Sequence, residues 1–278
     1  MHPSQSIERL LFCAEIDQKL AAIEEIEGFL ASGNAIQLEG QPRPSDQVVF
    51  PERPLRVDPR SLKRRSLKSP EGLRVFLHAI AHIEFSAIHL AVDAAYRFRD
   101  LPETFLRDWL GVAVEEARHF EAVVGRMRVL GADYGDYPAH AGLWELAIET
   151  AHDPLVRMAL VPRCMEARGL DVAPQMIEGL KAENDWESVT LLEMILREEI
   201  GHVAIGTRWY REIAISRQLD PDQYFFDLVT QYLDGDLKGP FNREARRSAG
   251  FSEGELNRLD AMEIERERSR IRIPSKVN

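Results

Sequence analysis

Apolar residues recur every three or four positions along most of the chain, and this spacing predicts helices rather than strands. A first helical pattern covers residues 4–31, and Gly33-Asn34 predicts its end. Ser69-Pro70-Glu71 is typical of a helix start, because Pro is favoured at the first helical position. The four longest patterns cover residues 71–99, 102–130, 155–180 and 185–216.

The first long connection, residues 34–70, is rich in proline, which predicts an extended arm that is either wrapped over the core or loose. Near its end lies a basic cluster, Lys63, Arg64, Arg65 and Lys68. Such a cluster is more typical of a solvated face, or of ion pairs with an acidic body, than of phosphate binding.

The remaining connections predict shorter helices. One covers residues 140–151 and ends at Asp153-Pro154. Shorter helices are also expected after residue 216, followed by a highly charged tail beyond residue 262 that we expect to fray.

No run of alternating, β-branched residues predicts a strand, so we expect an all-α fold. The connection between the second and third long helices is much longer than the other two. This favours an up-down four-helix bundle with one long crossover, the ferritin-like arrangement. We therefore expect an N-terminal helix and arm (residues 1–70), the bundle (71–216) and a C-terminal helical extension (217–278).

Composition limits the class of protein. Hydrophobic residues make up 45% and charged residues 29% of 278 residues, which predicts a globular protein with a real core. The formal charge of −11 argues mildly against a broad nucleic-acid surface. The two cysteines, Cys13 and Cys164, form no C-x-x-C motif, which excludes a zinc ribbon, a rubredoxin-type iron site and a disulfide framework.

The start of the chain lacks the basic residues and the cleavage site of a signal peptide. No run approaches the roughly 18 apolar residues of a membrane span. We therefore expect a cytoplasmic protein without a membrane partner.

The chain repeats one arrangement, in which a single Glu is followed about one helix later by Glu-x-x-His. The residues are Glu84 with Glu116 and His119, and Glu166 with Glu199 and His202. The single Glu precedes the pair by 116 − 84 = 32 residues in the first copy and by 199 − 166 = 33 residues in the second. A Glu and a His three residues apart share one helix face, and this set matches the ligands of a dinuclear carboxylate site in a four-helix bundle.

These Glu residues interrupt apolar helix faces, where an unpaired carboxylate would cost several kcal/mol. Divalent cations resolve that conflict, and carboxylate oxygen with imidazole nitrogen suits iron or manganese. The alternative is ordinary surface Glu residues on helices whose apolar faces lie elsewhere. The doubled spacing favours metal, and we expect two iron ions, with manganese as the alternative.

Several neighbouring residues could be mistaken for ligands. Glu115 and Glu198 lie four residues before the two His residues, and this alternative pairing stays open. Glu149 and His152 form a third match at a helix end, where helix-terminal hydrogen bonding is the simpler role. Asp93 and Asp171 are weak candidates to orient a metal-bound His.

Other residues near the candidate ligands are expected to be structural. We assign core or surface roles to His78, His82 and His89, and a buried position to Cys164. The nearby arginines are expected to pair with acidic neighbours; they are Arg97, Arg118, Arg163 and Arg168.

Over nearly its whole length the chain resembles an uncharacterised, mostly bacterial family of the ferritin-like superfamily, a domain of unknown function. The resemblance lies in the strings Arg53-Pro54, Lys63-Arg64-Arg65, Ser69-Pro70-Glu71-Gly72, His78-Ala79-Ile80-Ala81-His82-Ile83-Glu84, Glu115-Glu116-Ala117-Arg118-His119-Phe120, Gly135-Asp136-Tyr137-Pro138, Glu166-Ala167-Arg168-Gly169-Leu170-Asp171, Arg197-Glu198-Glu199-Ile200-Gly201-His202-Val203, Gly239-Pro240-Phe241-Asn242 and Ala245-Arg246. It implies the ferritin-like fold and a dinuclear metal site on the six residues named above, but no substrate. A more distant similarity in site layout is to the tRNA hydroxylase that acts on isopentenylated adenosine.

The leading functional expectation is a di-iron oxidoreductase that activates O₂ or peroxide and hydroxylates a small organic or nucleoside substrate. One alternative is a rubrerythrin-like scavenger of peroxide or O₂. Because the chain lacks a C-x-x-C iron domain, such turnover needs an external electron donor. A second alternative is a metal-handling protein without turnover, and a third is a purely structural bundle. The proline-rich arm and the C-terminal extension argue against assembly into a storage cage, although an oligomer is possible. The acidic net charge argues against tRNA binding but does not exclude it.

Overall fold

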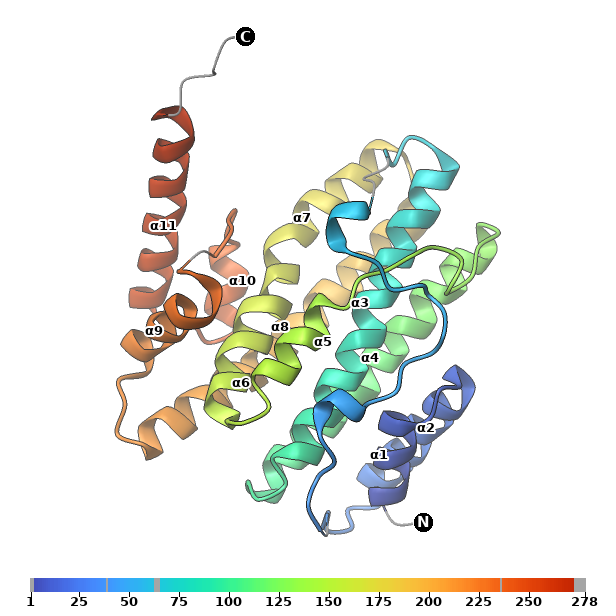
Figure 1. Cartoon of the computed structure of the whole chain (residues 1–278). Coiled ribbons are helices and arrows are strands. Elements are labelled where there is room, and N and C mark those ends of the chain that lie inside the picture. Colours follow the sequence, from blue (N-terminus) through green and yellow to red (C-terminus); the bar gives the residue numbers. More distant parts are fainter. Residues whose placement is uncertain (1–2, 39, 63–65, 236, 273–278) are drawn as a thin grey trace. The chain divides into compact units, whose positions relative to one another are not determined.

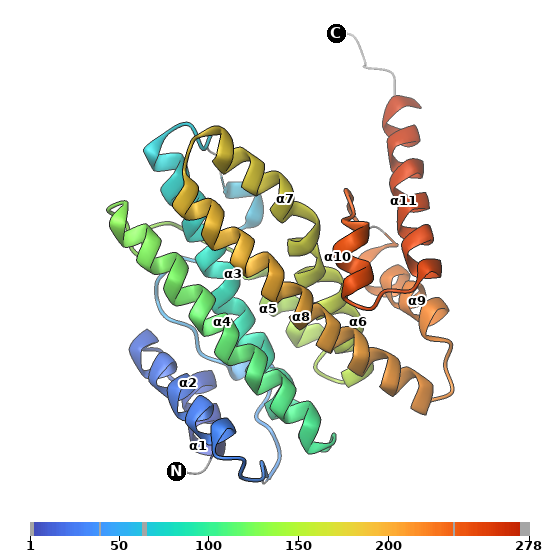
Figure 2. The ribbon, with the colours of Figure 1, turned by 180° about the vertical axis from the view of Figure 1, so that it is seen from behind.

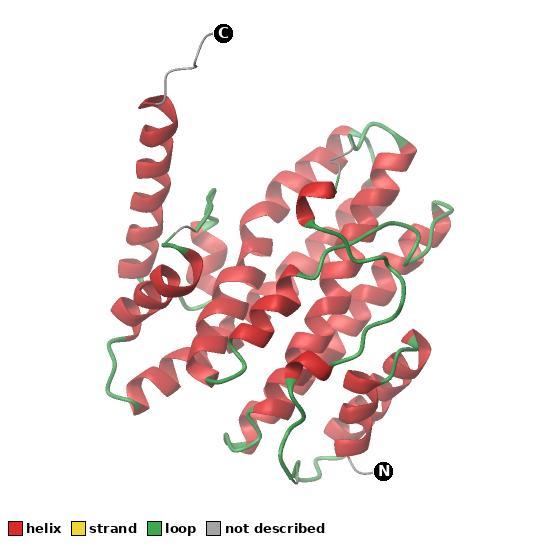
Figure 3. Ribbon diagram, viewed as in Figure 1, coloured by secondary structure: helices red, strands yellow, loops and turns green. Residues whose placement is uncertain are grey.

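The computed structural model describes residues 3–38, 40–62, 66–235 and 237–272. Figure 3 shows helices joined by loops, and within these ranges there is no β-strand, only an isolated bridge between Arg56 and Ala139. The prediction of an all-α fold is therefore confirmed. Lys63, Arg64 and Arg65 of the predicted basic cluster lie outside the described residues.

The described chain divides into two compact units. The first takes in the residues up to Pro154 together with Gly179–Leu191. The second takes in Leu155–Glu178 and the residues from Leu192 onward. Each unit is described separately below.

The first unit is built on two long helices, α3 (Pro70–Arg97) and α4 (Glu103–Val129), which pack side by side in both views (Figures 1 and 2). The predicted start of α3 is confirmed, because the Ser69 hydroxyl accepts the Gly72 N–H at 3.0 Å as an N-cap. After α4 the chain turns at Gly131, whose φ of +78° favours glycine.

The N-terminal pattern forms two helices, α1 (Pro3–Phe12) and α2 (Ile16–Ala31), rather than the single predicted helix. They pack on each other, and α2 packs on α4. The buried Lys19 of α2 donates to the carbonyl of Leu10 in the last turn of α1. The apolar spacing continues across the break at residues 13–15, so periodicity alone could not reveal it.

The proline-rich arm is wrapped over the first unit. Its described residues, 34–38, 40–62 and 66–69, contain only the short 3₁₀ turns η1 (Ser45–Gln47) and η2 (Pro59–Ser61). The Val57 N–H donates to the carbonyl of Ala139 at 2.8 Å, so the arm pairs with the connection that follows α4. The Phe50 ring lies 4.6 Å from the His89 ring, centroid to centroid. Of the two predicted states of the arm, wrapped over the core or loose, these contacts support the wrapped one.

The predicted third helix has three parts. They are α6 (Pro154–Leu160), the π-helix η3 (Val161–Glu166) and α7 (Ala167–Ala182), preceded by the short helix α5 (Gly142–Glu149). The fourth long helix, α8, covers Trp186–Ser216 and agrees with its predicted range. Both α7 and α8 run from one compact unit into the other.

Beyond α8 the second unit holds α9 (Pro221–Leu233), α10 (Arg243–Ser248) and α11 (Glu253–Arg272). The last helix is longer than predicted and continues through much of the charged tail. The polar composition of this segment explains why its helix was not predicted, because an exposed helix shows little apolar periodicity.

One described helix, α3, is long and apolar enough to cross a membrane by length and composition, although no apolar run in the sequence predicted a span. Its most apolar window is 67% buried within the protein. That burial is typical of the core helix of a soluble protein, so the length of α3 is weak support for a membrane span.

Candidate metal centre

The first repeat of the Glu … Glu-x-x-His arrangement comes together within the first unit. Glu84 lies on α3 between the buried residues Ala81 and Phe85, and it is itself buried. Glu116 and His119 lie on the buried face of α4. The packing of α3 on α4 therefore brings residues 32 positions apart to one place.

The three side chains are close enough to share one cation. One candidate ligand atom from each lies within 4.8 Å of those of the other two. The His119 Nδ1 lies 3.2 Å from Glu84 Oε2 and 3.6 Å from Glu116 Oε2. The Glu116 and His119 side chains are 1% and 0% exposed, so this is a buried cluster with two carboxylates and one imidazole.

The electrostatics of this cluster favour a positive charge. Burial lowers the pKa of His119, but the hydrogen bonds and charges of Glu116 and Glu84 outweigh that effect and raise it to about 11. Two carboxylates buried against one ring hold a cation, whether a proton on His119 or a metal ion. The donor set of oxygen and imidazole nitrogen fits iron or manganese.

The second repeat lies in the second unit. On α8 the His202 Nδ1 is 3.5 Å from Glu199 Oε1, and the two side chains are 1% and 14% exposed. The half-buried Glu166 is the last residue of η3. The second Glu-x-x-His pair thus has nearly the same geometry as the first.

The π-helix that carries Glu166 was not predicted. A π turn holds one residue more than an α turn, so it shifts the helix face that follows. Pro162 lies inside it and cannot donate an N–H to the carbonyl of Met158, as an α-helix requires. A proline within a predicted long helix was the sequence signal for this irregularity.

The neighbouring glutamates differ from the candidate ligands in burial. Glu198 is exposed and Glu115 is half-buried, whereas Glu116 is buried. The alternative pairing at four-residue spacing is therefore less favoured. The third match behaves as predicted, because His152 is exposed and its Nδ1 lies 2.9 Å from the Glu149 carbonyl oxygen.

The three histidines of α3 outside the cluster have structural partners. His82 Nε2 lies 3.0 Å from the His140 carbonyl oxygen, and its Nδ1 lies 2.9 Å from the Tyr134 hydroxyl. His78 Nε2 accepts the Gly135 N–H at 3.0 Å. His89 is fully buried against aromatic rings. These histidines hold the arm and the loop after α4, so the predicted core roles are confirmed.

The arginines pair with acidic groups, as predicted. The partners are Asp93 for Arg97, Glu27 for Arg118, Glu255 for Arg163 and Asp171 for Arg168. The buried position of Cys164 is also confirmed, and burial raises the pKa of its thiol to about 12.

The weak candidate Asp171 has a different role from the one considered for it. Both of its oxygens accept hydrogen bonds from the buried Arg246 guanidinium, at 2.9 and 2.7 Å. Its carboxylate therefore anchors α10 to α7. Asp93 accepts from Arg97 at 2.7 Å.

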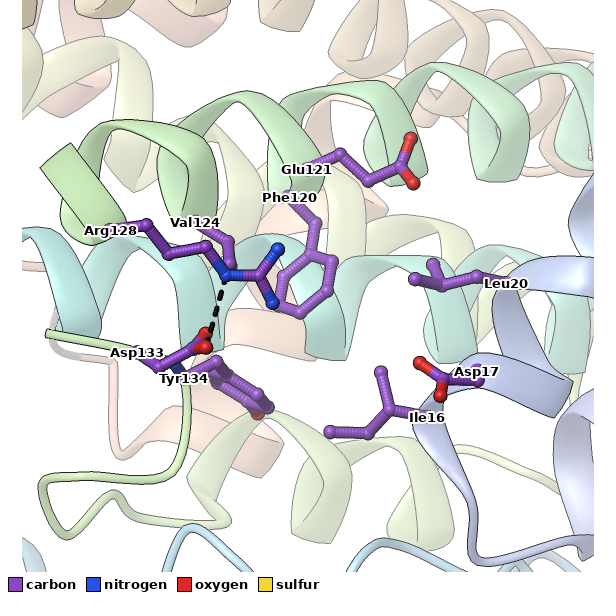
Figure 4. Close-up of a pocket in the computed structure, with 9 residues that line it drawn as sticks. All are labelled: Ile16, Asp17, Leu20, Phe120, Glu121, Val124, Arg128, Asp133 and Tyr134. Carbon is purple, nitrogen blue, oxygen red and sulfur yellow. Dashed lines mark hydrogen bonds and ion pairs between the residues drawn. The ribbon is translucent and has the colours of Figure 1, made fainter.

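Figure 4 shows a cavity of about 380 Å³ in the first unit, between α2, α4 and the loop after α4. Phe120 and Tyr134 form apolar walls, and Arg128 pairs with Asp133 at 3.0 Å across one side. A second cavity of about 280 Å³ lies between α9 and α11. None of the six candidate ligands lines either cavity, so neither is a direct route to them.

Comparison with known proteins gives a family but no activity. Residues 12–257 match the family described as a protein of unknown function (DUF455), a range that includes all six candidate ligands. A protein of Haemophilus influenzae (strain ATCC 51907 / DSM 11121 / KW20 / Rd), named only as an uncharacterized protein, is 44% identical over 264 residues. The alignment covers 91% of this chain and 92% of that protein. No solved structure matches. The chain belongs to the DUF455 family.

Proposed function

We propose that this protein is a dinuclear metal carboxylate protein, with iron as the metal, and that it activates O₂ or peroxide as an oxidoreductase. Six residues would hold the metals: Glu84, Glu116, His119, Glu166, Glu199 and His202. In this proposal α3, α4, η3–α7 and α8 supply the helices of a ferritin-like bundle. The proposed compartment is the cytoplasm.

The observation that carries the proposal is the buried cluster of Glu84, Glu116 and His119, with ligand atoms within 4.8 Å. Buried carboxylates are costly unless a cation compensates them. The same Glu–His geometry on α8 supports a second set of ligands. The repeated sequence spacing is the reason for combining both sets in one centre.

When bound, a pair of iron ions supplies redox chemistry toward O₂ or peroxide. The chain supplies anionic oxygens that balance the charge of the ions, and imidazoles that complete the donor set. The buried side chains around the first repeat exclude water from it. Glu84 and Glu116 raise the pKa of His119, which favours the protonated ring, so a metal ion at that ring would compete with a proton.

The leading subclass remains hydroxylation of a small organic or nucleoside substrate with an external electron donor. A rubrerythrin-like scavenger and a metal-handling protein without turnover are the alternatives. The two described cavities favour none of these, because no candidate ligand lines them.

The test is turnover. Iron-loaded protein is mixed with an external reductant, and consumption of O₂ and of peroxide is followed separately. We expect consumption that is lost in the double variant Glu116→Ala/Glu199→Ala. Faster consumption of peroxide than of O₂ would favour scavenging. No consumption of either by iron-loaded protein would contradict oxidoreductase activity and leave metal handling.

A further inference from the structure

The π-helix η3, which ends at Glu166, carries a buried arginine that no part of the proposed metal centre uses. The Arg163 Nη2 donates to Glu255 Oε1 on α11 at 2.5 Å, and both side chains are 0% exposed. The Arg163 guanidinium also lies 4.1–4.5 Å from the ring centroids of Tyr210, Phe225 and Phe251. A fully buried charge with one carboxylate partner is held in a narrow range of positions.

Glu255 is fixed from its own side as well. The Ser252 N–H donates to Glu255 Oε2 at 2.9 Å, and the Glu255 N–H donates to the Ser252 hydroxyl at 3.0 Å. This reciprocal pair is a capping box at the start of α11. One carboxylate therefore joins the first turn of α11 to the π turn that ends at Glu166.

A second buried ion pair holds the other side of Glu166. Arg246 of α10 donates twice to Asp171 of α7, and its Nη1 is 3.5 Å from the Arg163 carbonyl oxygen. The C-terminal helices thus contact the chain three residues before Glu166 and five residues after it. Glu166 lies between two anchored points.

Close packing adds a third constraint on η3. A Cβ atom on Gly206 of α8 would lie 2.4 Å from the Cβ and Cγ of Pro162, so only glycine permits this approach. The π turn is therefore enclosed by α8 on one side and tied to α10 and α11 by ion pairs. Pro162 accounts for the interruption of the α-helix at this point, and the contacts from α8, α10 and α11 fix the position of the π turn.

We propose that α10 and α11 act as a clamp that positions Glu166 as a metal ligand, through Arg163–Glu255 and Asp171–Arg246. This inference rests on the proposed function, since it assumes that Glu166 binds metal. Arg163 and Glu255 are positioning residues, because they act through η3 rather than on a metal ion. In this proposal the C-terminal helices α10 and α11 determine the position of a metal ligand, in addition to packing against the rest of the second unit.

The test compares Co²⁺ binding by metal-free wild-type protein and by variants of the clamp. Glu255→Gln removes the charge but keeps the capping box, which accepts Gln as well as Glu. The double variant Arg163→Met/Glu255→Gln also removes the buried cation, so that no uncompensated charge remains. The control is Glu253→Gln, two residues away on the same helix, which removes the charge from the exposed pairs with Arg243 at 2.7 Å and Arg247 at 2.6 Å.

We expect wild type and Glu253→Gln to bind Co²⁺ with the same affinity and the same visible d–d spectrum. Both clamp variants are expected to stay helical by circular dichroism, to bind Co²⁺ about tenfold more weakly and to show an altered spectrum. Unchanged affinity and spectrum in the variants, with only a lower melting temperature, would mean that the clamp merely stabilises the fold. A wild-type protein that binds no Co²⁺ would overturn the proposed function, and this inference with it.

A measurement on the wild-type protein tests the clamp without any variant. If the clamp is coupled to the metal site, bound Co²⁺ slows amide hydrogen exchange at Ser252–Glu255, because coupling is reciprocal. Exchange there that is the same with and without Co²⁺ would contradict the clamp.

Discussion

At the scale of single residues, burial separates the candidate ligands from similar residues nearby. The sequence contains three Glu-x-x-His matches, and the structure buries two of the His residues, His119 and His202, while His152 is exposed. The repeat spacing predicted this distinction. The anchoring of Asp171 by Arg246 could not be predicted, because the two residues are 75 positions apart and only the packed second unit brings them together.

His78 gives a prediction for pH dependence. Burial, with a smaller contribution from His82, lowers the pKa of His78 to about 4, and its neutral Nε2 accepts the Gly135 N–H. The unfolded chain binds a proton near pH 6.5, so the stability that depends on neutral His78 is complete above that pH. It is lost as pH falls from about 6.5 to about 4.

The prediction is measured by urea unfolding of metal-free protein between pH 7 and pH 4. We expect His78→Gln to be less stable than wild type at pH 7, by about 1–3 kcal/mol, because a buried hydrogen bond and ring packing are weakened. The difference in the free energy of unfolding between the two proteins should become smaller toward pH 4, where wild type loses the stability that neutral His78 provides. The control His152→Gln, at an exposed position, should follow wild type. A constant difference between wild type and His78→Gln would rule out this role.

At the scale of helices, the apolar spacing predicted the long elements well. The ranges of α3, α4 and α8 agree with the expected ones within a few residues. Two of the failures have one physical origin, since periodicity reports which face of a helix is buried and not whether the backbone is continuous. The break before α2 and the π turn η3 both leave the apolar pattern intact.

The contact between α8 and η3 gives a prediction at this scale. Gly206→Ala places a Cβ 2.4 Å from Pro162, so we expect it to destabilise the protein by about 1–3 kcal/mol. Gly201→Ala is the matched control on the same helix, because no atom lies within 4 Å of its Cβ position. That variant should instead gain about 0.5–1 kcal/mol from helix propensity. Equal stabilities of both variants in urea unfolding would show that α8 does not need glycine against η3.

At the scale of the whole molecule, the fold class and the family are observed, whereas the metal centre and its reaction are proposed. The all-α fold and the family follow from observation, and the family match covers residues 12–257. The ferritin-like bundle, the iron and the reaction with O₂ are proposals that rest on ligand types, burial and spacing. A substrate cannot be predicted from these residues, because ligand type and spacing describe what binds a metal and not what approaches it.

The most direct test of the central claim is the metal content of purified protein expressed with an iron supply, in wild type and in two matched double variants. We predict about two iron ions per chain in wild type, the number that a dinuclear carboxylate site holds. Glu115→Ala/Glu198→Ala should keep them, whereas Glu116→Ala/Glu199→Ala should hold less than one. No metal or one metal in wild type, or equal metal content in all three proteins, would contradict a dinuclear centre built on these six residues.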